Sequence, residues 1–481
     1  MWLPDNSLFV PVVDPNMAPE RTAAQLLSME DRLAGFDEVE KTYTPEEAQT
    51  EASRCLKCPT QWCSKACPAG VRVTDFIAAA RKGDFEGAYQ IIRSSSMLPE
   101  ICSRVCPQEK QCQSNCTRSI RSEAVGIGKL ERFVVEQHYA SNAAEPTAPA
   151  TGKSVAVVGS GPSGLSAAQR LADLGYSVTV FERADRVGGL LEYGIPNMKL
   201  EKGVVARKVA ALESQGVTFR TGVNVGVDLS PADLTAQYDA VILAVGTANA
   251  RSLKLEGAEN VRGIVRAVDF LSAATRAVLD GDEPAVAEGK QVVIVGGGDT
   301  GSDCVGTSLR QGCKSITQLE MLPKNTKREF IHAVHPPKAP EAKRDFSQEE
   351  CAHVQGDPRK YQTTVKAVQA DENGNLVSIT VVELDAVYDA NFRLTMVEKA
   401  GSEQTIPCDL LIVAAGFIGP EGYVAEAFGL NTTERTNLAA EGFAAADKIF
   451  VCGDCRTGQS LVVKAMVDGR DCADAVDSYL K

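Results

Sequence analysis

Eight cysteines in two short stretches carry the clearest chemistry in this sequence. The first four stand within CLKCPTQWCSKACP and the other four within CSRVCPQEKQCQSNC. Four soft thiolates around one centre suit a cubane iron–sulfur cluster, so eight suffice for two [4Fe–4S] clusters. The Cys-Pro dipeptides are typical of ferredoxin-like runs. The candidate ligands are Cys55, Cys58, Cys63, Cys67, Cys102, Cys106, Cys112 and Cys116.

Two other interpretations of these eight residues are a zinc site and a set of free core thiols. Zinc ribbons favour two C-x2-C pairs, and this segment has one, at Cys55 and Cys58. A disulfide framework is not expected, because the N-terminus does not resemble a secretory signal. Iron–sulfur ligation is therefore the favoured hypothesis. Five further cysteines are expected to be ordinary core or surface thiols: Cys304, Cys313, Cys351, Cys408 and Cys472.

A last pair, Cys452 and Cys455, forms a C-x2-C motif that offers a rival function. Such a pair is typical of dithiol–disulfide reductases. Here, however, it brackets Gly453-Asp454, which we expect to contact a cofactor. A turn already used for that contact is a poor place for a redox disulfide, so this reading is disfavoured.

Two glycine-rich turns predict two dinucleotide sites. Each follows an apolar strand, opens a helix and precedes a second strand with a carboxylate about 20 residues on. The glycines allow the tight turn, the approach of a pyrophosphate and close helix–strand packing, and the helix N-terminus attracts phosphate. One such motif alone is weak, but two complete copies disfavour a purely structural role. The key residues are Gly159, Gly161, Gly164 and Glu182 in the first copy, and Gly296, Gly298, Gly301 and Glu320 in the second.

Other candidate contacts lie outside the two turns. A flavin is long and needs a second contact beyond its pyrophosphate, and Gly453-Asp454 between a strand and a helix suits its ribityl chain and phosphate. AVGT and AAGF, which end short strands, are expected to cross between two domains. The remaining cofactor-binding candidates are Ser160, Ser163, Gly188, Gly189, Leu190, Val225, Gly246, Thr247, Asp299, Thr300 and Gly416.

Three kinds of segment must position these residues. Up to about residue 148 the pattern is mostly helical, with a capped start at Thr44, and residues 141–152 read as a linker. The rest alternates strands and helices and predicts an α/β fold with two Rossmann-like domains. The net charge of −13 argues against nucleic acid or an anionic membrane as partner. Because no apolar run is long enough to span a bilayer, a cytoplasmic location is expected.

Nearly the whole chain resembles the small (β) subunit of glutamate synthase. The resemblance rests on both cysteine stretches and on GIGKLERFVVEQ, VGSGPSGLSAAQRLADLGYSVTVFER, GGLLEYGIPNMKL, GGGDTGSDCVGTSLRQGC and CGDCRTGQSLVVKA. The same layout occurs in the N-terminal half of dihydropyrimidine dehydrogenase and in the large subunit of NADH-dependent ferredoxin:NADP oxidoreductase. Lys464 departs from the family, in which a bulky apolar residue is expected near the flavin.

The resemblance implies a domain order and a place for each cofactor. Residues 1–148 would hold two [4Fe–4S] clusters, 149–255 and 411–481 would bind FAD, and 256–410 would bind NAD(P)H. In two-cluster ferredoxins the last cysteine of a run ligates the other cluster. By this analogy and the resemblance, one cluster is expected on Cys55, Cys58, Cys63 and Cys116, and the other on Cys67, Cys102, Cys106 and Cys112.

The expected activity is oxidation of NAD(P)H, with a hydride passed to FAD and single electrons passed through the clusters to another protein. No catalytic acid or base is expected, because hydride transfer to a flavin needs positioning. The resemblance implies the glutamate synthase large subunit as acceptor, in glutamate biosynthesis. Alternatives are the electron-input subunit of a transhydrogenase-type or other oxidoreductase, the disulfide reductase above and, less favoured, an inert scaffold.

The nucleotide preference depends on Glu320. A carboxylate there accepts hydrogen bonds from the ribose hydroxyls of NADH and repels the 2′-phosphate of NADPH. Against this, Lys324, Lys327 and Arg328 follow closely, and a folded-back loop could bind the phosphate. The sequence favours NADH slightly.

Overall fold

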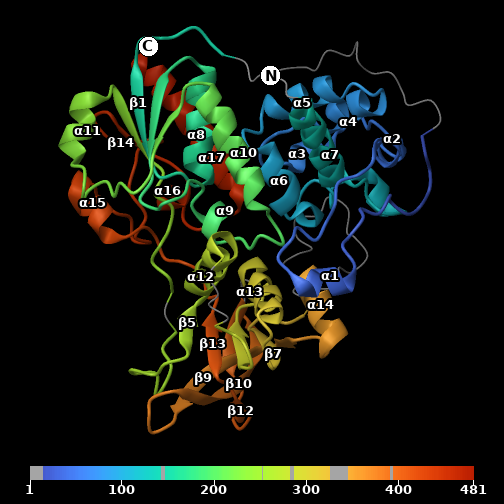
Figure 1. Cartoon of the computed structure of the whole chain (residues 1–481), viewed down its shortest axis with the longest axis vertical. Helices are drawn as coiled ribbons and strands as arrows, with labels where there is room; N and C mark the ends of the chain where they lie inside the picture. Colours follow the sequence, from blue (N-terminus) through green and yellow to red (C-terminus); the bar gives the residue numbers. More distant parts are fainter. Residues whose placement is uncertain (1–14, 142–146, 252, 282–285, 325–344, 390–393) are drawn as a thin grey trace.

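The computed structural model describes residues 15–141, 147–251, 253–281, 286–324, 345–389 and 394–481. Its elements form three bodies: a helical body, a first-sheet body and a second-sheet body (Figure 1). The helical body and the first-sheet body lie side by side, and the second-sheet body lies below both. The α/β class with an N-terminal helical part is therefore confirmed.

The helical body surrounds the eight cysteines. As expected, α2 starts with a capping box in which Thr44 and Glu47 bond each other's backbone N–H groups. Gly83, with φ +80°, separates α4 from α5. The first helix, α1, lies apart and contacts α13 and α14 of the second-sheet body. The bounds are α1 Met29–Ala34, α2 Pro45–Ala52, α3 Trp62–Ala66, α4 Val73–Arg81, α5 Phe85–Arg93, α6 Pro99–Val105, η2 Gln108–Lys110, η3 Thr117–Ile120 and α7 Ile127–Ala140.

The first-sheet body is built on six strands in the order β14-β15-β4-β1-β2-β3. All pair in parallel except β14, which is antiparallel to β15. Figure 1 shows α8, α10 and α17 on the face toward the helical body and α11 and α15 on the other. The strands are β1 Ser154–Val158, β2 Ser177–Phe181, β3 Thr218–Arg220, β4 Ala240–Leu243, β14 Ala444–Ala446 and β15 Ile449–Val451. The helices are α8 Pro162–Asp173, α9 Leu190–Tyr193, α10 Lys202–Ser214, α11 Pro231–Gln237, α15 Gly422–Phe428, α16 Asp454–Thr457 and α17 Val462–Leu480.

The second-sheet body contains a five-stranded parallel sheet in the order β5-β13-β6-β7-β8. Helices pack on one face of it, and an antiparallel sheet of β9 to β12 packs on the other. The strands are β5 Ile264–Arg266, β6 Gln291–Val295, β7 Ser315–Glu320, β8 Arg359–Tyr361, β9 Thr363–Ala370, β10 Leu376–Tyr388, β11 Leu394–Glu398, β12 Gln404–Pro407 and β13 Leu410–Val413. The helices are α12 Ala267–Asp280, α13 Asp299–Arg310 and α14 Phe346–Val354.

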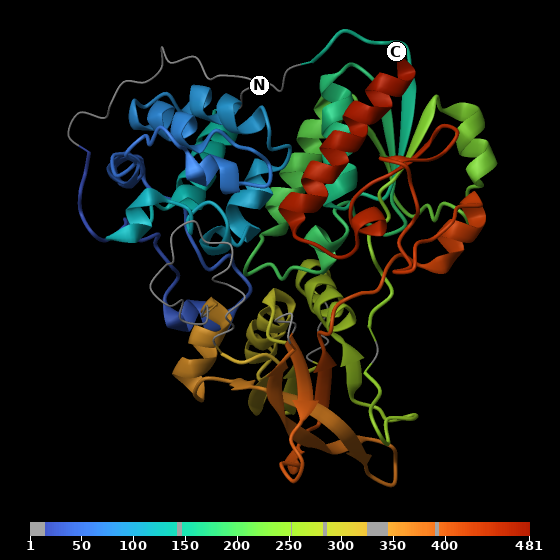
Figure 2. The same cartoon turned by 180° about the vertical axis from the view of Figure 1, so that it is seen from behind.

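Two segments cross between the sheets, and they run side by side (Figure 2). They follow β4 and β13, and Ala250 bridges Phe417 between them. The crossings therefore fall at AVGT and AAGF, where the sequence predicts them. The expected domain limit at residue 410 lies inside β13, which belongs to the second sheet. We accordingly propose that the second domain extends to Val413.

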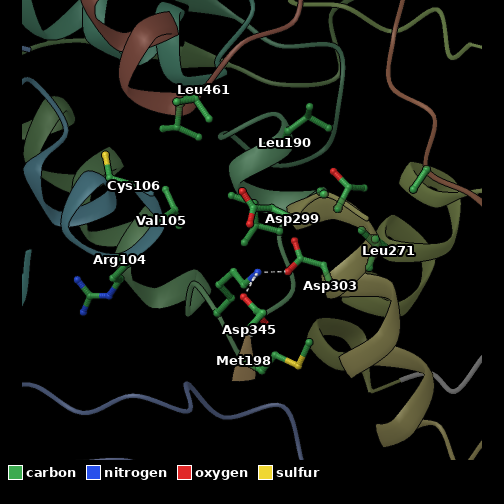
Figure 3. Close-up of a pocket in the computed structure, with 18 of the residues that line it drawn as sticks. Arg104, Val105, Cys106, Leu190, Met198, Leu271, Asp299, Asp303, Asp345 and Leu461 are labelled. Atoms are coloured by element: carbon green, nitrogen blue, oxygen red, sulfur yellow. Dashed lines mark ion pairs between the residues drawn. The ribbon is translucent and has the colours of Figure 1, made fainter. Parts of the chain in front are cut away.

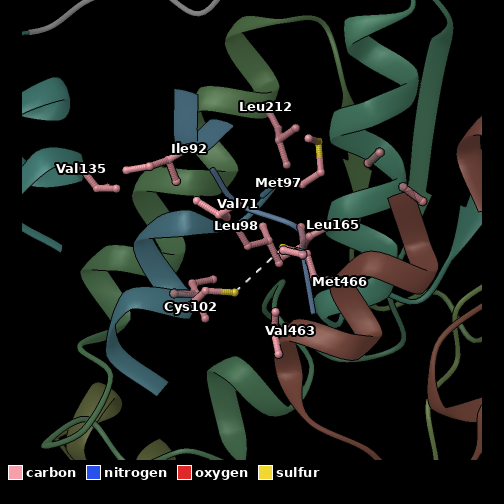
Figure 4. Packing of buried hydrophobic residues seen from close by; sticks show 14 of the residues in the cluster. Val71, Ile92, Met97, Leu98, Cys102, Val135, Leu165, Leu212, Val463 and Met466 are labelled. Carbon is pink, nitrogen blue, oxygen red and sulfur yellow. Dashed lines mark hydrogen bonds between the residues drawn. The ribbon is translucent and has the colours of Figure 1, made fainter. Parts of the chain in front are cut away.

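One hydrophobic core joins the helical body to the first-sheet body. It includes Ile92 and Leu98 from the helical body and Leu165, Leu212 and Met466 from the helices that cover the first sheet (Figure 4). Met466 on α17 lies between α6 and α8. Because the core is continuous, the cysteine-bearing segment has a fixed position against the first-sheet body.

Candidate cofactor-binding and electron-transfer site

The first glycine-rich turn joins β1 to α8 in a form that needs small residues. Gly159 has φ +100°, and a Cβ on it would lie 2.5 Å from the Ala244 carbonyl oxygen. A Cβ on Gly164 would lie 1.9 Å from the Gly159 carbonyl oxygen. A Cβ on Gly161 would meet no described atom within 4 Å, so the chain faces open space there. No described side chain caps α8, which leaves its first N–H groups for an anion.

Glu182, directly after β2, connects this turn through hydrogen bonds to the glycine pair Gly188-Gly189. Its Oε2 accepts a hydrogen bond from the Ser160 N–H at 3.0 Å and another from the Ser160 hydroxyl. That hydroxyl oxygen accepts from the Gly188 N–H at 2.9 Å. A Cβ on Gly189 would lie 3.0 Å from the Cα of Gly161. The structure thus brings both glycine motifs of the first unit together.

The C-terminal Gly-Asp motif closes on the same turn. Gly453 has φ +75°, and a Cβ on it would lie 2.4 Å from the Ser163 Oγ at the start of α8. Its N–H donates to Asp468 on α17 at 2.6 Å. Asp454 accepts a hydrogen bond from Ser460 at 2.8 Å, and burial raises the pKa of its carboxyl. Asp468 belongs to no sequence motif, and it reaches Gly453 only because α17 packs on α8.

The second glycine-rich turn repeats this geometry between β6 and α13. Gly296 has φ +130°, and a Cβ on it would lie 2.5 Å from the Ala414 carbonyl oxygen. A Cβ on Gly301 would lie 2.0 Å from the Gly296 carbonyl oxygen, and a Cβ on Gly298 would meet no described atom within 4 Å. Glu320 ends β7, and its Oε1 accepts from the Leu322 N–H at 2.7 Å. The two turns therefore offer equivalent phosphate cradles.

A cavity of about 760 Å³ lies where the three bodies meet (Figure 3). Its walls include Cys106 of the helical body, Leu190 of α9, Asp303 of α13 and Leu461 before α17. Of the predicted cofactor residues, Leu190, Gly298, Asp299, Thr300, Gly301 and Gly416 line it. The first glycine turn, Glu320 and the Gly453-Asp454 motif lie outside its walls. A molecule held at the second turn would thus reach both α9 and a cysteine.

Three predicted residues lie in the first-sheet body or its crossing. Gly246 has φ +64°, a conformation that favours glycine. Thr247, next to it, is 8% exposed. Val225 is buried in the core beside Phe181, on the face that α11 and α15 cover. Val225 thus has a packing role in the structure, and its contact with a cofactor stays a prediction.

A charged cluster that the sequence reading missed lies at one wall of the cavity. Lys199, from the loop before α10, forms ion pairs with Asp303 on α13 and with Asp345, the latter at 3.4 Å (Figure 3). All three side chains are less than 15% exposed. Burial raises the pKa of Asp303 to about 6, and Asp345 adds to the rise while Lys199 opposes it. This cluster links the first-sheet body to the second-sheet body.

The eight cysteines lie close to one another, and we group them into two predicted sets. Burial raises the pKa of Cys63 to about 12, and the thiols of Cys55, Cys116 and Cys58 contribute to the rise. The pKa of the Cys55 thiol is also raised to about 12. Burial is the main cause, and Cys116 and Cys58 contribute to the rise. We call Cys55, Cys58, Cys63 and Cys116 the first cysteine set. These thiols are close in space although Cys116 is far away in sequence.

The second cysteine set is Cys67, Cys102, Cys106 and Cys112. Burial raises the pKa of Cys67, and Cys102 is among the contributing neighbours. The pKa of Cys106 rises through a hydrogen bond with Cys102 and through burial. Burial also raises the pKa of Cys112, with Cys67 as the next cause and Cys63 of the first set among the smaller ones. The crossed ligation expected from ferredoxins is compatible with these neighbours and stays a prediction.

A carboxylate that the sequence reading missed faces the second set. Glu131 on α7 contributes to the raised pKa values of Cys67, Cys106 and Cys112. The Sγ of Cys102 lies 3.9 Å from the Met466 Sδ in the core (Figure 4). Cys102 stays the predicted fourth ligand of this set, and Glu131 is a second candidate because it neighbours the other three cysteines. The motif GIGKLERFVVEQ contains Glu131, but nothing in its pattern marks a ligand.

The remaining cysteines are mostly buried. Cys304, Cys351, Cys408 and Cys472 are buried, and Cys313 is partly buried. Cys452 and Cys455 are both fully buried, and the Cys455 thiol donates to the Leu243 carbonyl. A protein disulfide cannot reach this pair, which disfavours the reductase alternative.

Two further observations concern metals and the nucleotide loop. Within the described ranges, no three His, Cys, Asp or Glu side chains converge as they would on a single metal ion. A cubane holds its ligands farther apart, at the corners of the cluster. Of the three basic residues considered for nucleotide binding, Lys324 is described, and Lys327 and Arg328 lie outside the described residues. Among described residues, no helix is long and apolar enough to cross a membrane.

Two family models match the chain. Residues 32–143 match the family described as dihydropyrimidine dehydrogenase domain II, 4Fe-4S cluster. Residues 122–234 and 153–469 match the pyridine nucleotide-disulphide oxidoreductase family. The division agrees with the helical body and the two sheets.

Individual relatives cover nearly the whole chain. The glutamate synthase [NADPH] small chain of Bacillus subtilis is 36% identical over 467 residues, which cover 93% of this chain and 94% of that one. The glutamate synthase [NADH] of Schizosaccharomyces pombe is 35% identical over 460 residues, and the match covers 93% of this chain and 22% of that protein. Mycobacterium tuberculosis FprA in complex with NADPH has a TM-score of 0.54 at 19% identity over 69% of this chain and 85% of that chain, a likeness of fold alone.

Proposed function

This chain belongs to the family of glutamate synthase small chains, NAD(P)H-dependent oxidoreductases with an iron–sulfur domain, and from that premise we propose that it feeds electrons from NAD(P)H to a glutamate synthase large chain. The observation that carries the proposal is the cavity shared by the second glycine turn, α9 and Cys106. This cavity supports the proposal because the predicted nucleotide turn, the first-sheet body and the predicted cluster ligand Cys106 all line it.

The first-sheet body fits FAD. The first turn and Gly188-Gly189 would hold its pyrophosphate, and Gly453-Asp454 its ribityl chain and flavin phosphate. The space beside Gly161 supports this assignment, because a phosphate can approach the bare backbone there. When bound, FAD supplies the exchange between two-electron and one-electron chemistry. The residues of this chain bind and orient it, and we assign no protein acid or base to the reaction.

The second turn fits the nicotinamide nucleotide, with Gly298 and the start of α13 at its phosphates. We propose NADH as the preferred donor, because Glu320 places a carboxylate at the end of β7 where the adenosine ribose would bind. Small chains named for NADPH and a glutamate synthase named for NADH occur among the relatives. The preference therefore depends on this chain's own residues.

The two cysteine sets fit two [4Fe–4S] clusters. The first set would hold one cluster, and Cys67, Cys106 and Cys112, with Cys102 or Glu131, would hold the other. The second set lies closer to the first-sheet body, because Cys106 lines the cavity and Cys102 contacts α17. We propose that electrons enter through the second set and leave through the first.

The test combines this protein with a purified glutamate synthase large chain. The proposal expects NADH oxidation to depend on glutamine and 2-oxoglutarate together and to yield glutamate. The protein alone should reduce only artificial acceptors such as ferricyanide. If the mixture forms no glutamate while the protein reduces ferricyanide, the acceptor is another protein.

A further inference from the structure

Two segments that overlap the cysteine stretches are basic, although the chain is acidic. The chain has 63 Asp and Glu residues against 50 Lys and Arg residues. Residues 52–74 carry four basic residues and residues 110–122 carry three, and neither range contains an acidic residue. The charge of these two segments is therefore opposite in sign to that of the whole chain, and a role for it should lie near the cysteines.

Two of these basic side chains are buried inside the helical body. Arg54 and Arg118 are 1% and 4% exposed and donate hydrogen bonds to backbone carbonyls, among them those of Glu123 and Asn16. Buried cations of this kind can offset the negative charge of thiolate-bound clusters. Lys65 and Arg121, by contrast, are exposed, and Lys65 lies 4.7 Å above the ring of Trp62. The exposed cations are available to a partner.

Exposed apolar side chains accompany these cations. Met17 is 64% exposed and Ile120 is 53% exposed. The Arg118 Nη1 lies 3.2 Å from the Met17 Sδ, which places Met17 beside η3. The Cys58 Sγ lies 3.3 Å from the Thr117 Oγ1, also on η3. We call Met17, Lys65, Ile120 and Arg121 the basic face. Met17, Ile120 and Arg121 lie at or beside η3, which follows Cys116, and Lys65 lies on α3, the helix that contains Cys63.

The basic face lies where an electron acceptor must approach. Among the eight cysteines, Cys106 of the second set lines the large cavity, and none of the first set does. The first set is therefore the one farther from the nucleotide site. Electron transfer between proteins requires the two redox centres to be close, so the acceptor should cover this side.

We propose that the basic face is the docking surface for an acidic face of the electron-accepting protein. This inference rests on the proposed function and specifies how its partner is recognised. The cations steer an acidic surface into place. Met17 and Ile120 then supply apolar contact that excludes water at the centre.

The test measures binding of the complete, cluster-loaded protein to the purified large chain. Affinity should fall as ionic strength rises from about 0.01 M to about 1 M, where the Debye length shrinks from about 30 to about 3 Å. The double variant Lys65→Glu/Arg121→Glu should weaken binding about tenfold or more, a cost of about 1.4 kcal/mol or more. Its ferricyanide reduction and iron content should match the wild type.

A matched double variant, Lys314→Glu/Lys360→Glu, makes the same charge change on exposed residues of the second-sheet body. It should bind the large chain as the wild type does. An equal loss of affinity in the two double variants would overturn the proposed role of the basic face. A shift of the cluster potentials without loss of binding would also overturn it, in favour of simple charge compensation. If the wild type itself does not bind the large chain, the proposed partner is wrong, and the proposed role of the basic face falls with it.

Discussion

Gly161 and Gly298 hold the same place in the two turns, and they allow the two nucleotide sites to be tested separately. Both have ordinary φ values, −67° and −78°, and a Cβ on either meets open space. Gly161→Val should therefore fold, lose FAD and lose all NAD(P)H-dependent ferricyanide reduction. Gly298→Val should keep FAD and raise the KM for NAD(P)H. Flavin absorbance and steady-state kinetics measure both, and stoichiometric FAD in Gly161→Val would contradict the assignment.

Glu320 is the residue on which the proposed preference for NADH depends. Two like charges about 4 Å apart cost on the order of 1 to 4 kcal/mol at water-like to surface-like dielectric, which is roughly a tenfold preference or more. The wild type should show a higher kcat/KM with NADH than with NADPH, and Glu320→Ala should narrow the gap. A wild-type preference for NADPH would show that nearby cations, such as Lys324, outweigh the carboxylate.

Cys102 and Glu131 can be distinguished as ligands by exchanging each alone. If Glu131 completes the second set, Glu131→Ala should lower the iron content and change the electron paramagnetic resonance spectrum of one cluster, whereas Cys102→Ser should leave both clusters intact. If Cys102 is the ligand, the two results reverse. Cys472→Ser, at a buried thiol outside both sets, controls for general damage to the fold. Loss of neither cluster in both variants would exclude both residues as ligands.

At the residue scale the sequence was most informative where chemistry demands a fixed spacing. Glycines at turns and cysteines in short runs are set by local geometry, so Gly159 and Cys63 can be recognised without a structure. Asp468 and Glu131 could not be recognised, because each meets its partners only through packing of distant helices. Lys199 was missed for the same reason, since its two carboxylates come from another body.

At the scale of elements, α17 is the layer between α8, the helix after the first glycine turn, and the cysteines. Met466 accepts a hydrogen bond from the Ser166 hydroxyl of α8 through its backbone oxygen at 2.6 Å. Its Sδ lies 3.9 Å from the Cys102 Sγ of α6. The sequence predicts α17 as a helix after the Gly-Asp motif, but no pattern shows that its other face meets α6. Packing alone gives this helix its second role.

The side chain of Met466 should therefore affect electron passage. Met466→Ala should destabilise the protein by about 2 to 5 kcal/mol, because it opens a cavity in the shared core. It should also slow cluster reduction after the flavin is reduced, because electrons tunnel less efficiently through a void than through packed atoms. Met466→Leu keeps the volume and should cost less than about 1.5 kcal/mol. Rapid-mixing absorbance can compare the variants, and equal rates for Ala and Leu would contradict the idea.

At the scale of the whole molecule, the sequence predicted the two Rossmann-like units and the helical part. The repeated strand, turn and helix pattern is local, so it could be read directly. How the bodies meet could not, because the contacts involve residues with no periodic signal. The segment that contains α1 illustrates this, since Arg310 of α13 donates to the Gly35 carbonyl at 2.8 Å. This segment connects the helical body to the second-sheet body.

The cluster of Lys199, Asp303 and Asp345 gives the junction between the sheets a pH dependence whose sign can be derived. The pKa of Asp303 is about 6 in the folded protein, above the value of about 3.9 for an unfolded Asp. The folded state therefore binds this proton more tightly, so the contribution of Asp303 to stability is largest at low pH and declines as pH rises through about 6. At neutral pH the buried carboxylate depends on Lys199 to offset its burial.

Asp303→Asn removes this titration and nearly preserves the shape of the side chain. The Tm of the wild type minus that of the variant should therefore be more positive at pH 5 than at pH 7, because only the wild type gains from proton uptake. Differential scanning calorimetry of both proteins at both pH values measures the difference, and effects of other titrating groups cancel in it. Asp385→Asn, at an exposed position on β10, should show no such change. An identical wild-type-minus-variant difference at the two pH values would mean that Asp303 does not titrate in this window and that the junction is insensitive to pH.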